Sequence, residues 1–231
     1  MKDRKTRRLV PLALSMALLG MSGAASGAGG RTEAFCNTTP IAIPVSGTSG
    51  PASVYPSTVT GTGMPPSVTK LTVQLIGLSH TFPGDLDIML VGPQGQQVML
   101  MSDAGGSGDL VAADLIFDDG APGPLPGTAI AAGAYRPTDL GTPPDPFPAP
   151  APAGTPSTQL SSFNGSNPNG VWSLYINDDA GIDTGSLNGW CVNITSEIPG
   201  PVAVPALGGL GLGLLSGLLA LGAFWSRRRA A

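Results

Sequence analysis

Short runs in which apolar and polar residues alternate, each ended by glycine or proline, are the feature that most limits the fold of this chain. The clearest run lies between Ser79 and Gly106 and is interrupted by Gly92-Pro93-Gln94-Gly95. A period of two places every second residue of a strand in the core, and glycine and proline supply the reversal between two strands. We therefore predict a β-hairpin here. Its inward-facing residues would be Leu86, Ile88, Leu90, Val98 and Leu100.

The same pattern continues on both sides of this hairpin. Further runs cover residues 41–45, 54–60, 68–78, 111–117, 171–177 and 187–195. With 34 glycines, 24 prolines and only 5% aromatic residues, the composition suits many short strands. We predict an all-β fold, a jelly-roll β-sandwich like that of galactose-binding domains, with about eight antiparallel strands. Val111 would share the inward face of its run with Ala113, and the last two runs would pair as a closing hairpin.

The two ends of the chain differ from this body. Residues 1–28 combine basic residues, an apolar run and a small-residue stretch, as secretory signal peptides do. Residues 207–225 carry no charge, are long enough to cross a bilayer, and are followed by Arg227-Arg228-Arg229. We expect a signal peptide at 1–28, a folded body at 29–198 and a sorting or transmembrane segment with a basic tail at 199–231.

The C-terminal segment resembles the bacterial sorting tags of the PEP-CTERM and IPTL-CTERM kind, on its Val-Pro-Ala at 204–206, its glycine-rich apolar span and its arginine cluster. This resemblance implies an exported protein that is anchored in the inner membrane with its body outside. A sorting protease would then remove the tag and pass the body to the cell surface or the medium. A permanent anchor through residues 207–225 is the alternative.

Charge is unevenly distributed along the sequence. Fourteen of the fifteen acidic residues, but only three of the eleven basic ones, lie between residues 29 and 198, which gives this body a net charge of −11. Such a surface repels phosphate backbones, so nucleic acid is excluded as a partner, whereas a calcium-containing medium would suit it. A surface that only aids solubility is the other interpretation.

The only two cysteines, Cys36 and Cys191, lie near the two ends of the body. In an exported protein we expect them to form a disulfide that ties the first strand to the last. The absence of a CxxC pattern argues against redox chemistry and against a zinc site.

Aspartates at turns are the candidate metal ligands, because calcium takes six to eight oxygens from converging loops. Two of them, at alternate positions of a strand, would point to one side, and three would follow in the closing turn. The candidates are Asp85, Asp87, Asp178, Asp179 and Asp183, with Asn177 as an additional oxygen donor and Asp103, Asp118 and Asp119 for a second site. The alternative is that these carboxylates only accept backbone hydrogen bonds in turns.

The segments SHTFPGDLDIMLVGPQG and NGVWSLYINDDAGIDTGSLNGW, in this order and separation, resemble the P domain (P/Homo B domain) of proprotein convertases and bacterial subtilisin-like proteases. The family motif maps to His80, Gly84, Leu86, Gly170, Trp172 and Gly185. The resemblance implies a jelly roll that, in convertases, packs against a protease domain, stabilises it and tunes its calcium and pH dependence.

The sequence does not contain the protease that this family accompanies. A subtilisin-type triad needs a histidine as its base, and the only histidine, His80, belongs to the P-domain motif. The triplet Asp183-Thr184-Gly185 lacks the second copy that an aspartic protease requires. Residues 137–157 are rich in proline and predict an extended surface loop that acts as a spacer or, alternatively, in recognition.

We therefore predict a non-catalytic surface module that binds or stabilises an unidentified surface protein or glycan, with calcium as a candidate cofactor. The alternative is an accessory subunit of a separate subtilisin-like serine protease. A third hypothesis, a hydrolase in its own right, predicts turnover that depends on Asp85 or Asp183.

Overall fold

The computed structural model describes residues 30–44, 46–47, 49–141, 145 and 147–200. The signal peptide expected at 1–28 and the membrane segment expected at 207–225 lie outside these residues. In the part of the chain that is described, no helix has the length and apolar character needed to cross a bilayer.

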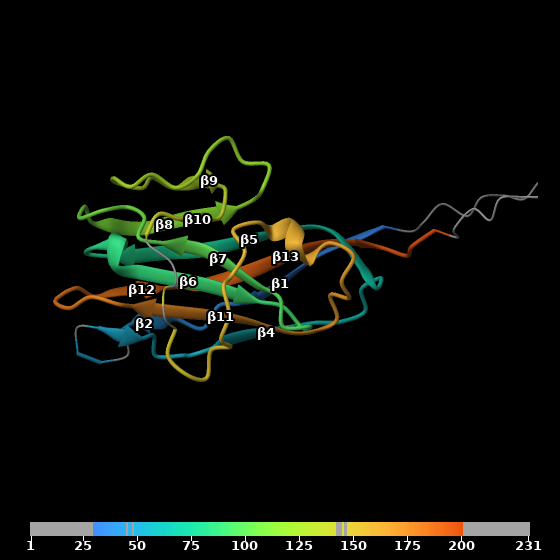
Figure 1. Cartoon of the computed structure of the whole chain (residues 1–231), viewed down its shortest axis with the longest axis horizontal. Helices are drawn as coiled ribbons and strands as arrows, with labels where there is room; N and C mark the ends of the chain where they lie inside the picture. Colours follow the sequence, from blue (N-terminus) through green and yellow to red (C-terminus); the bar gives the residue numbers. More distant parts are fainter. Residues whose placement is uncertain (1–29, 45, 48, 142–144, 146, 201–231) are drawn as a thin grey trace, which may run out of the picture.

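Thirteen β-strands and two short 3-10 turns build this part of the molecule (Figure 1). The strands of five or more residues are β1 (Arg31–Asn37), β4 (Ser57–Gly61), β5 (Ser67–His80), β6 (Leu86–Val91), β7 (Gln97–Ser102), β8 (Leu110–Phe117), β11 (Gly170–Asp178) and β13 (Gly189–Glu197). The shorter ones are β2 (Ile41–Ile43), β3 (Gly50–Pro51), β9 (Gly133–Tyr135), β10 (Thr138–Asp139) and β12 (Gly185–Leu187). The 3-10 turns are η1 (Pro83–Asp85) and η2 (Leu160–Phe163). The predicted all-β fold is confirmed, but the strands in this part of the chain number thirteen and not about eight, since β1, β3, β9 and β10 lie outside the predicted runs.

The strands form two sheets that pack as a sandwich. In the first sheet, β5 pairs with β13 and β12 and also with β8, while β1, β2 and β9 extend it outward. In the second sheet the order is β10-β7-β6-β11-β3, and β4 also pairs with β11. Most pairings are antiparallel as predicted, but β10–β7 and β8–β9 are parallel. Alternation within single strands does not predict these two short pairings, because each joins segments that are distant in sequence.

The core between the sheets is apolar and contains the aromatic residues expected there. Trp172 and Trp190 are fully buried, and each indole N–H has an acceptor: the Pro168 carbonyl at 3.0 Å for Trp172 and the Ser57 hydroxyl at 2.9 Å for Trp190. Pairing these donors removes the cost of burying a polar group. Trp172 and Trp190 thus lie on the inward faces predicted for the runs 171–177 and 187–195.

The predicted disulfide is present and joins the two strands that begin and end the body. Cys36 and Cys191 are direct partners in the antiparallel β1–β13 ladder, and their Cα atoms are 4.1 Å apart. The bond therefore closes a loop across a sequence separation of 155 residues.

The predicted central hairpin is confirmed, since β6 pairs with β7 and places Leu90 opposite Val98. Its start differs from the prediction. Asp85 belongs to η1 and not to a strand, and the strand begins at Leu86. Pro83 starts this 3-10 turn, so Asp85 and Asp87 do not form the same-face strand pair that the spacing suggested.

The predicted closing hairpin is wrong. β11 lies inside the second sheet, between β6 and the strands β3 and β4, whereas β13 pairs with β1 and β5 in the first sheet. Both edges of β11 are therefore already paired, and the chain after it crosses from one sheet to the other. The inward faces of β11 and β13 were nevertheless predicted correctly, because the face that a strand buries depends on its own alternation and not on the strand it pairs with.

The predicted inward position of Val111 is also wrong: the side chain is 75% exposed, and Leu110 is buried in its place. The reason is local. Ala112 has a φ of 45°, and the β5–β8 register shifts on both sides of Leu78. This irregularity adds a residue to the alternation, so the side chains before Ala113 change faces.

Gly185 is the motif residue with the tightest surroundings. A Cβ atom at this position would meet the Ser79 carbonyl oxygen and the His80 ring, both parts of the paired strand β5. We expect Gly185→Ala to lower the free energy of unfolding by about 1–3 kcal/mol, as overpacking does. Gly123→Ala is the matched control, because a Cβ there meets no atom within 4 Å. Urea unfolding of both variants would test this, and equal midpoints would contradict it.

A proline-rich segment covers the outer face of the second sheet, and we call its residues 147–157 the strap. Phe147 and Ala151 pack against a small apolar cluster of Met89, Val91 and Tyr175. The strap crosses in front of β6 and β11 in Figure 1. This cover explains why every residue of β6 is buried, although one face of the strand points away from the core.

Candidate metal centre

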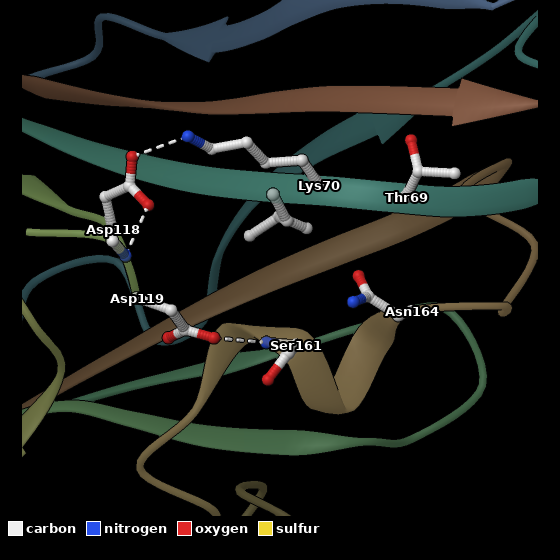
Figure 2. Close-up of a pocket in the computed structure, with 8 residues that line it drawn as sticks. Thr69, Lys70, Asp118, Asp119, Ser161 and Asn164 are labelled. Carbon is white, nitrogen blue, oxygen red and sulfur yellow. Dashed lines mark hydrogen bonds and ion pairs between the residues drawn. The ribbon is translucent and has the colours of Figure 1, made fainter.

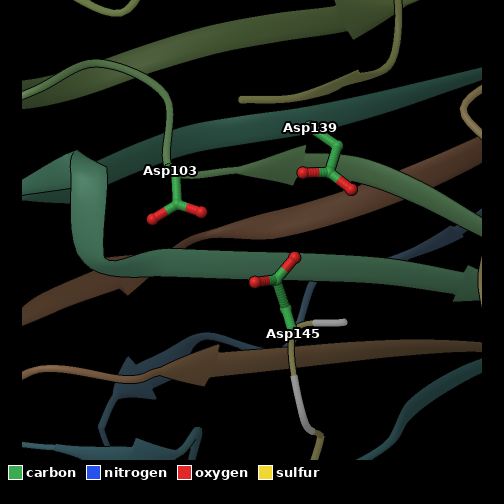
Figure 3. A group of neighbouring side chains, drawn as sticks. All are labelled: Asp103, Asp139 and Asp145. Carbon is green, nitrogen blue, oxygen red and sulfur yellow. The ribbon is translucent and has the colours of Figure 1, made fainter. Parts of the chain in front are cut away.

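Three aspartates, Asp103, Asp139 and Asp145, bring their carboxylates together beyond the end of β7 (Figure 3). The parallel pairing of β10 with β7 places Asp139 beside Ser102, and Asp103 follows directly in sequence. One carboxylate oxygen from each aspartate lies within 4.8 Å of those of the other two. Carboxylates at this separation repel one another unless a proton or a cation lies among them.

The hydroxyl of Ser102 contacts two of these three carboxylates. Its Oγ is 3.0 Å from Oδ2 of Asp145 and 3.3 Å from Oδ2 of Asp103. A hydroxyl has one proton, so it donates to only one carboxylate at a time. Ser102 can therefore orient these side chains but cannot balance their charge.

Asp87 adds a buried carboxylate to the same region. The residue is only 2% exposed, and its Oδ2 atom has no hydrogen-bond partner. Burial raises the pKa of Asp87 to about 7; a hydrogen bond from Ser102 opposes this shift, and the charges of Asp145, Asp179 and Asp103 add to it. Burial also raises the pKa of Asp179, as do the charges of Asp103 and Asp145. These carboxyl groups thus act on one another as one acidic site.

The ion pairs of the described residues leave this acidic site unbalanced. Arg31 pairs with Glu33, Lys70 with Asp118, and His80 with Asp178. None of these pairs includes Asp87, Asp103, Asp139, Asp145 or Asp179. In the described ranges, no basic side chain forms an ion pair with the site.

The five aspartates predicted as ligands divide between two places. Asp87 lies beside the acidic site, and the charge of Asp179 helps to raise the pKa of Asp87, although the Asp179 amide donates to the Asp85 carbonyl at 3.0 Å. The other three, Asp85, Asp178 and Asp183, lie around His80: burial and then the charges of Asp178, Asp179 and Asp183 raise the pKa of Asp85, whereas His80 lowers it. Asp183 accepts a hydrogen bond from the Thr81 hydroxyl at 2.8 Å, which is the turn role considered as the alternative.

His80 and Asp178 form a fully buried pair with 3.2 Å between Nε2 and Oδ2. The Nδ1 atom of His80 lies 2.9 Å from the Phe82 carbonyl oxygen and 3.3 Å from the Phe82 amide nitrogen, so both ring nitrogens have protein partners. The pair fixes the end of β5 against the end of β11.

Asp118 and Asp119, predicted for a second metal site, have structural partners, shown in Figure 2. Lys70 Nζ lies 2.8 Å from Oδ2 of Asp118, and the Gly120 amide donates to its other oxygen at 2.9 Å. Asp119 accepts from the backbone amides of Leu160 and Ser161, both at 2.8 Å. These contacts hold the β8 turn and the start of η2, and they occupy both carboxylates.

Asp139 and Asp145 are the members of the acidic site that the sequence did not suggest. Both lie in the proline-rich part of the chain, where no alternation places a side chain on a face. Their position depends on the parallel β10–β7 pair and on the contact of Asp145 with Ser102. The only local signal was the presence of acidic residues within a segment otherwise poor in charge.

No protein-family model matches this chain. The chain is 27% identical over 161 residues to leupeptin-inactivating enzyme 1 of Streptomyces exfoliatus, in a region that covers 68% of this chain and 25% of that protein. Similar solved structures include the serine protease of Aeromonas sobria (14% identity, TM-score 0.32, 71% of this chain and 27% of that one). The same protease in complex with its chaperone gives 14% identity and a TM-score of 0.33, over 72% of this chain and 28% of that one. The chain thus spans about a quarter of the length of these proteins.

Proposed function

We propose that the body of this chain is a non-catalytic accessory module of the P-domain type that binds and stabilises a partner outside the cell. The extent of the similarity carries this proposal, since 68% of this chain corresponds to only 25% of the Streptomyces enzyme. A segment of that size within a larger enzyme has the dimensions of one domain among several. The partner proposed is a surface protein or glycan, and a separate subtilisin-like serine protease is the alternative.

The only histidine and the two cysteines, residue types often used in hydrolysis, are buried or bonded, which supports a non-catalytic role. His80, the sole histidine in the sequence, is 2% exposed, and both of its ring nitrogens have protein partners. A general base must come within hydrogen-bond reach of the substrate, and a residue buried in this way is not accessible to one. The two cysteines form the disulfide, so neither offers a thiolate nucleophile.

The proposed location follows from the ends of the sequence. We place the body outside the inner membrane, held by residues 207–225 until a sorting protease removes the tag. Mass spectrometry of the C-terminus of protein recovered from the cell surface and the medium tests this step. Processed protein is expected to end before residue 207, and exported protein that retains Trp225 would exclude processing.

Assays on the purified full chain, kept in mild detergent, test the functional proposal. We expect no hydrolysis of casein or of peptide aldehydes above the buffer control. In a strain that lacks the chain, the bound surface partner is expected to lose heat stability, and added protein should restore it. Restored stability of a secreted subtilisin-like protease would select the alternative. Turnover that disappears in Asp183→Ala would overturn the proposal in favour of a hydrolase.

A further inference from the structure

The acidic site joins three separate segments of the chain and contains a buried carboxylate without a partner. Asp103 follows β7, Asp139 ends β10, and Asp145 precedes the strap. Asp87 directly precedes Ile88, which pairs with Met101, so the β6–β7 register places Asp87 beside Ser102. We propose that the three clustered carboxylates and the buried Asp87 together hold one calcium ion.

Two buried oxygens of this site have no partner, which the closeness of the carboxylates alone would not require. Oδ2 of Asp87 and Oδ1 of Asp139 are both inaccessible to solvent and have no hydrogen-bond partner in the structure. A buried polar atom without a partner costs about 1–3 kcal/mol, and more when the group is charged. Ser102 has only one proton to donate, so it cannot satisfy all of these oxygens. A cation among the carboxylates satisfies them and removes their mutual repulsion.

The chemistry of the donors selects the kind of cation. All four proposed ligands are carboxylates, and oxygen-only sites favour hard ions such as calcium and magnesium. The nitrogen and sulfur donors that zinc prefers are engaged elsewhere, His80 with Asp178 and both cysteines in the disulfide. Asp103 lies in a turn, Asp139 in a two-residue strand, and Asp145 precedes the strap. Calcium accepts such irregular geometry better than octahedral magnesium does.

The site connects the strap to the sheet beneath it. Beyond Asp145, the hydroxyl of Tyr55, in the loop between β3 and β4, donates to the Pro148 carbonyl at 2.9 Å. The Met99 amide of β7 donates to the Ser157 carbonyl at 2.9 Å. An ion bound between Asp145 and Asp103 would hold the chain just before the strap, whereas these two hydrogen bonds hold the strap itself. Calcium is therefore expected to order the strap over Met89 and Tyr175.

This site does not depend on the proposed partner, so calcium binding and partner binding can fail independently. Isothermal titration of the chelator-treated full chain with CaCl2 in 150 mM NaCl is the first measurement. We expect one site with a dissociation constant on the order of 0.1–1 mM, as in extracellular calcium modules, and at least tenfold weaker magnesium binding. At a calcium concentration about a hundredfold above that constant, the melting temperature should rise by about 5–10 °C.

Variants separate a built site from general charge screening. Asp145→Asn and Asp103→Asn should each weaken calcium binding at least tenfold, whereas the exposed Asp109→Asn, which removes the same charge outside the cluster, should stay within twofold. Hydrogen exchange of residues 147–157 should slow with calcium in the unchanged chain but not in Asp145→Asn. The absence of saturable binding at 10 mM calcium, or an equal loss in Asp109→Asn, would overturn the site. Binding without any change in exchange would overturn the role of the strap.

Discussion

Replacing both cysteines by alanine is expected to lower the free energy of unfolding by about 4–5 kcal/mol. Cys36 and Cys191 close a loop across 155 residues, and releasing such a loop gives the unfolded chain a large gain in conformational entropy. The native state should change little, because the two residues are also direct partners in the β1–β13 ladder. Urea unfolding of the double variant and of the oxidised chain measures the difference.

The control for this experiment is the unchanged chain, unfolded in the presence of a reductant. It should reproduce the midpoint of the Cys36→Ala/Cys191→Ala variant, because both lack the same bond. Hydrogen exchange separates two ways in which the bond could act. A loss of exchange protection confined to the amides of β1 would mean that the bond only prevents fraying of an edge strand. An unchanged urea midpoint would then contradict the predicted global effect.

Breaking the His80–Asp178 pair is expected to have the second largest effect. In His80→Leu, the buried carboxyl group of Asp178 loses its partner, and removing one member of a buried pair typically costs about 3–5 kcal/mol. The double variant His80→Leu/Asp178→Leu should lose less than the sum of the two single losses, because neither side chain then leaves the other buried without its partner. Urea unfolding of all four proteins gives this coupling, and additive losses would show that the pair is not a unit.

The pH dependence of His80→Leu provides a further check of the same pair. Burial raises the pKa of Asp178, and the nearby His80 opposes this shift, so the pKa should rise further without the ring. A carboxyl group whose pKa is higher in the folded state than in the unfolded state loses stability as the pH rises from its unfolded value towards its folded one. The deficit of His80→Leu should therefore be larger at pH 8 than near pH 4. A pH-independent deficit would contradict this origin.

The sequence predicted the elements of this fold better than their partners. Alternation identified the inward faces of β5, β6, β11 and β13, since each face depends only on the residues of its own strand. It could not show that β11 and β13 belong to different sheets, because both strands bury their apolar rows in the same core. The positive φ of Ala112, which exposes Val111, has no signature in an alanine.

The candidate metal centre was predicted only in part, because the sequence pattern of a single strand does not show which distant segments come together. Asp87 and Asp103 were recognised because they lie at a strand and a turn with clear patterns. Asp139 and Asp145 were not, because a two-residue parallel pairing and a contact with Ser102 bring them there. The proline-rich strap was interpreted as a surface spacer, yet its apolar residues form the outer cover of β6.

The pairing of the first strand with the last also has a mechanical consequence. β1 and β13 leave the body at the same end in Figure 1, with Arg31 opposite Ser196. A load that pulls these two ends apart would unzip the ladder only as far as Cys36 and Cys191, where a covalent bond takes over the tension. The sandwich between the two cysteines then lies outside the line of force. A body built in this way can be pulled from both ends without being unravelled.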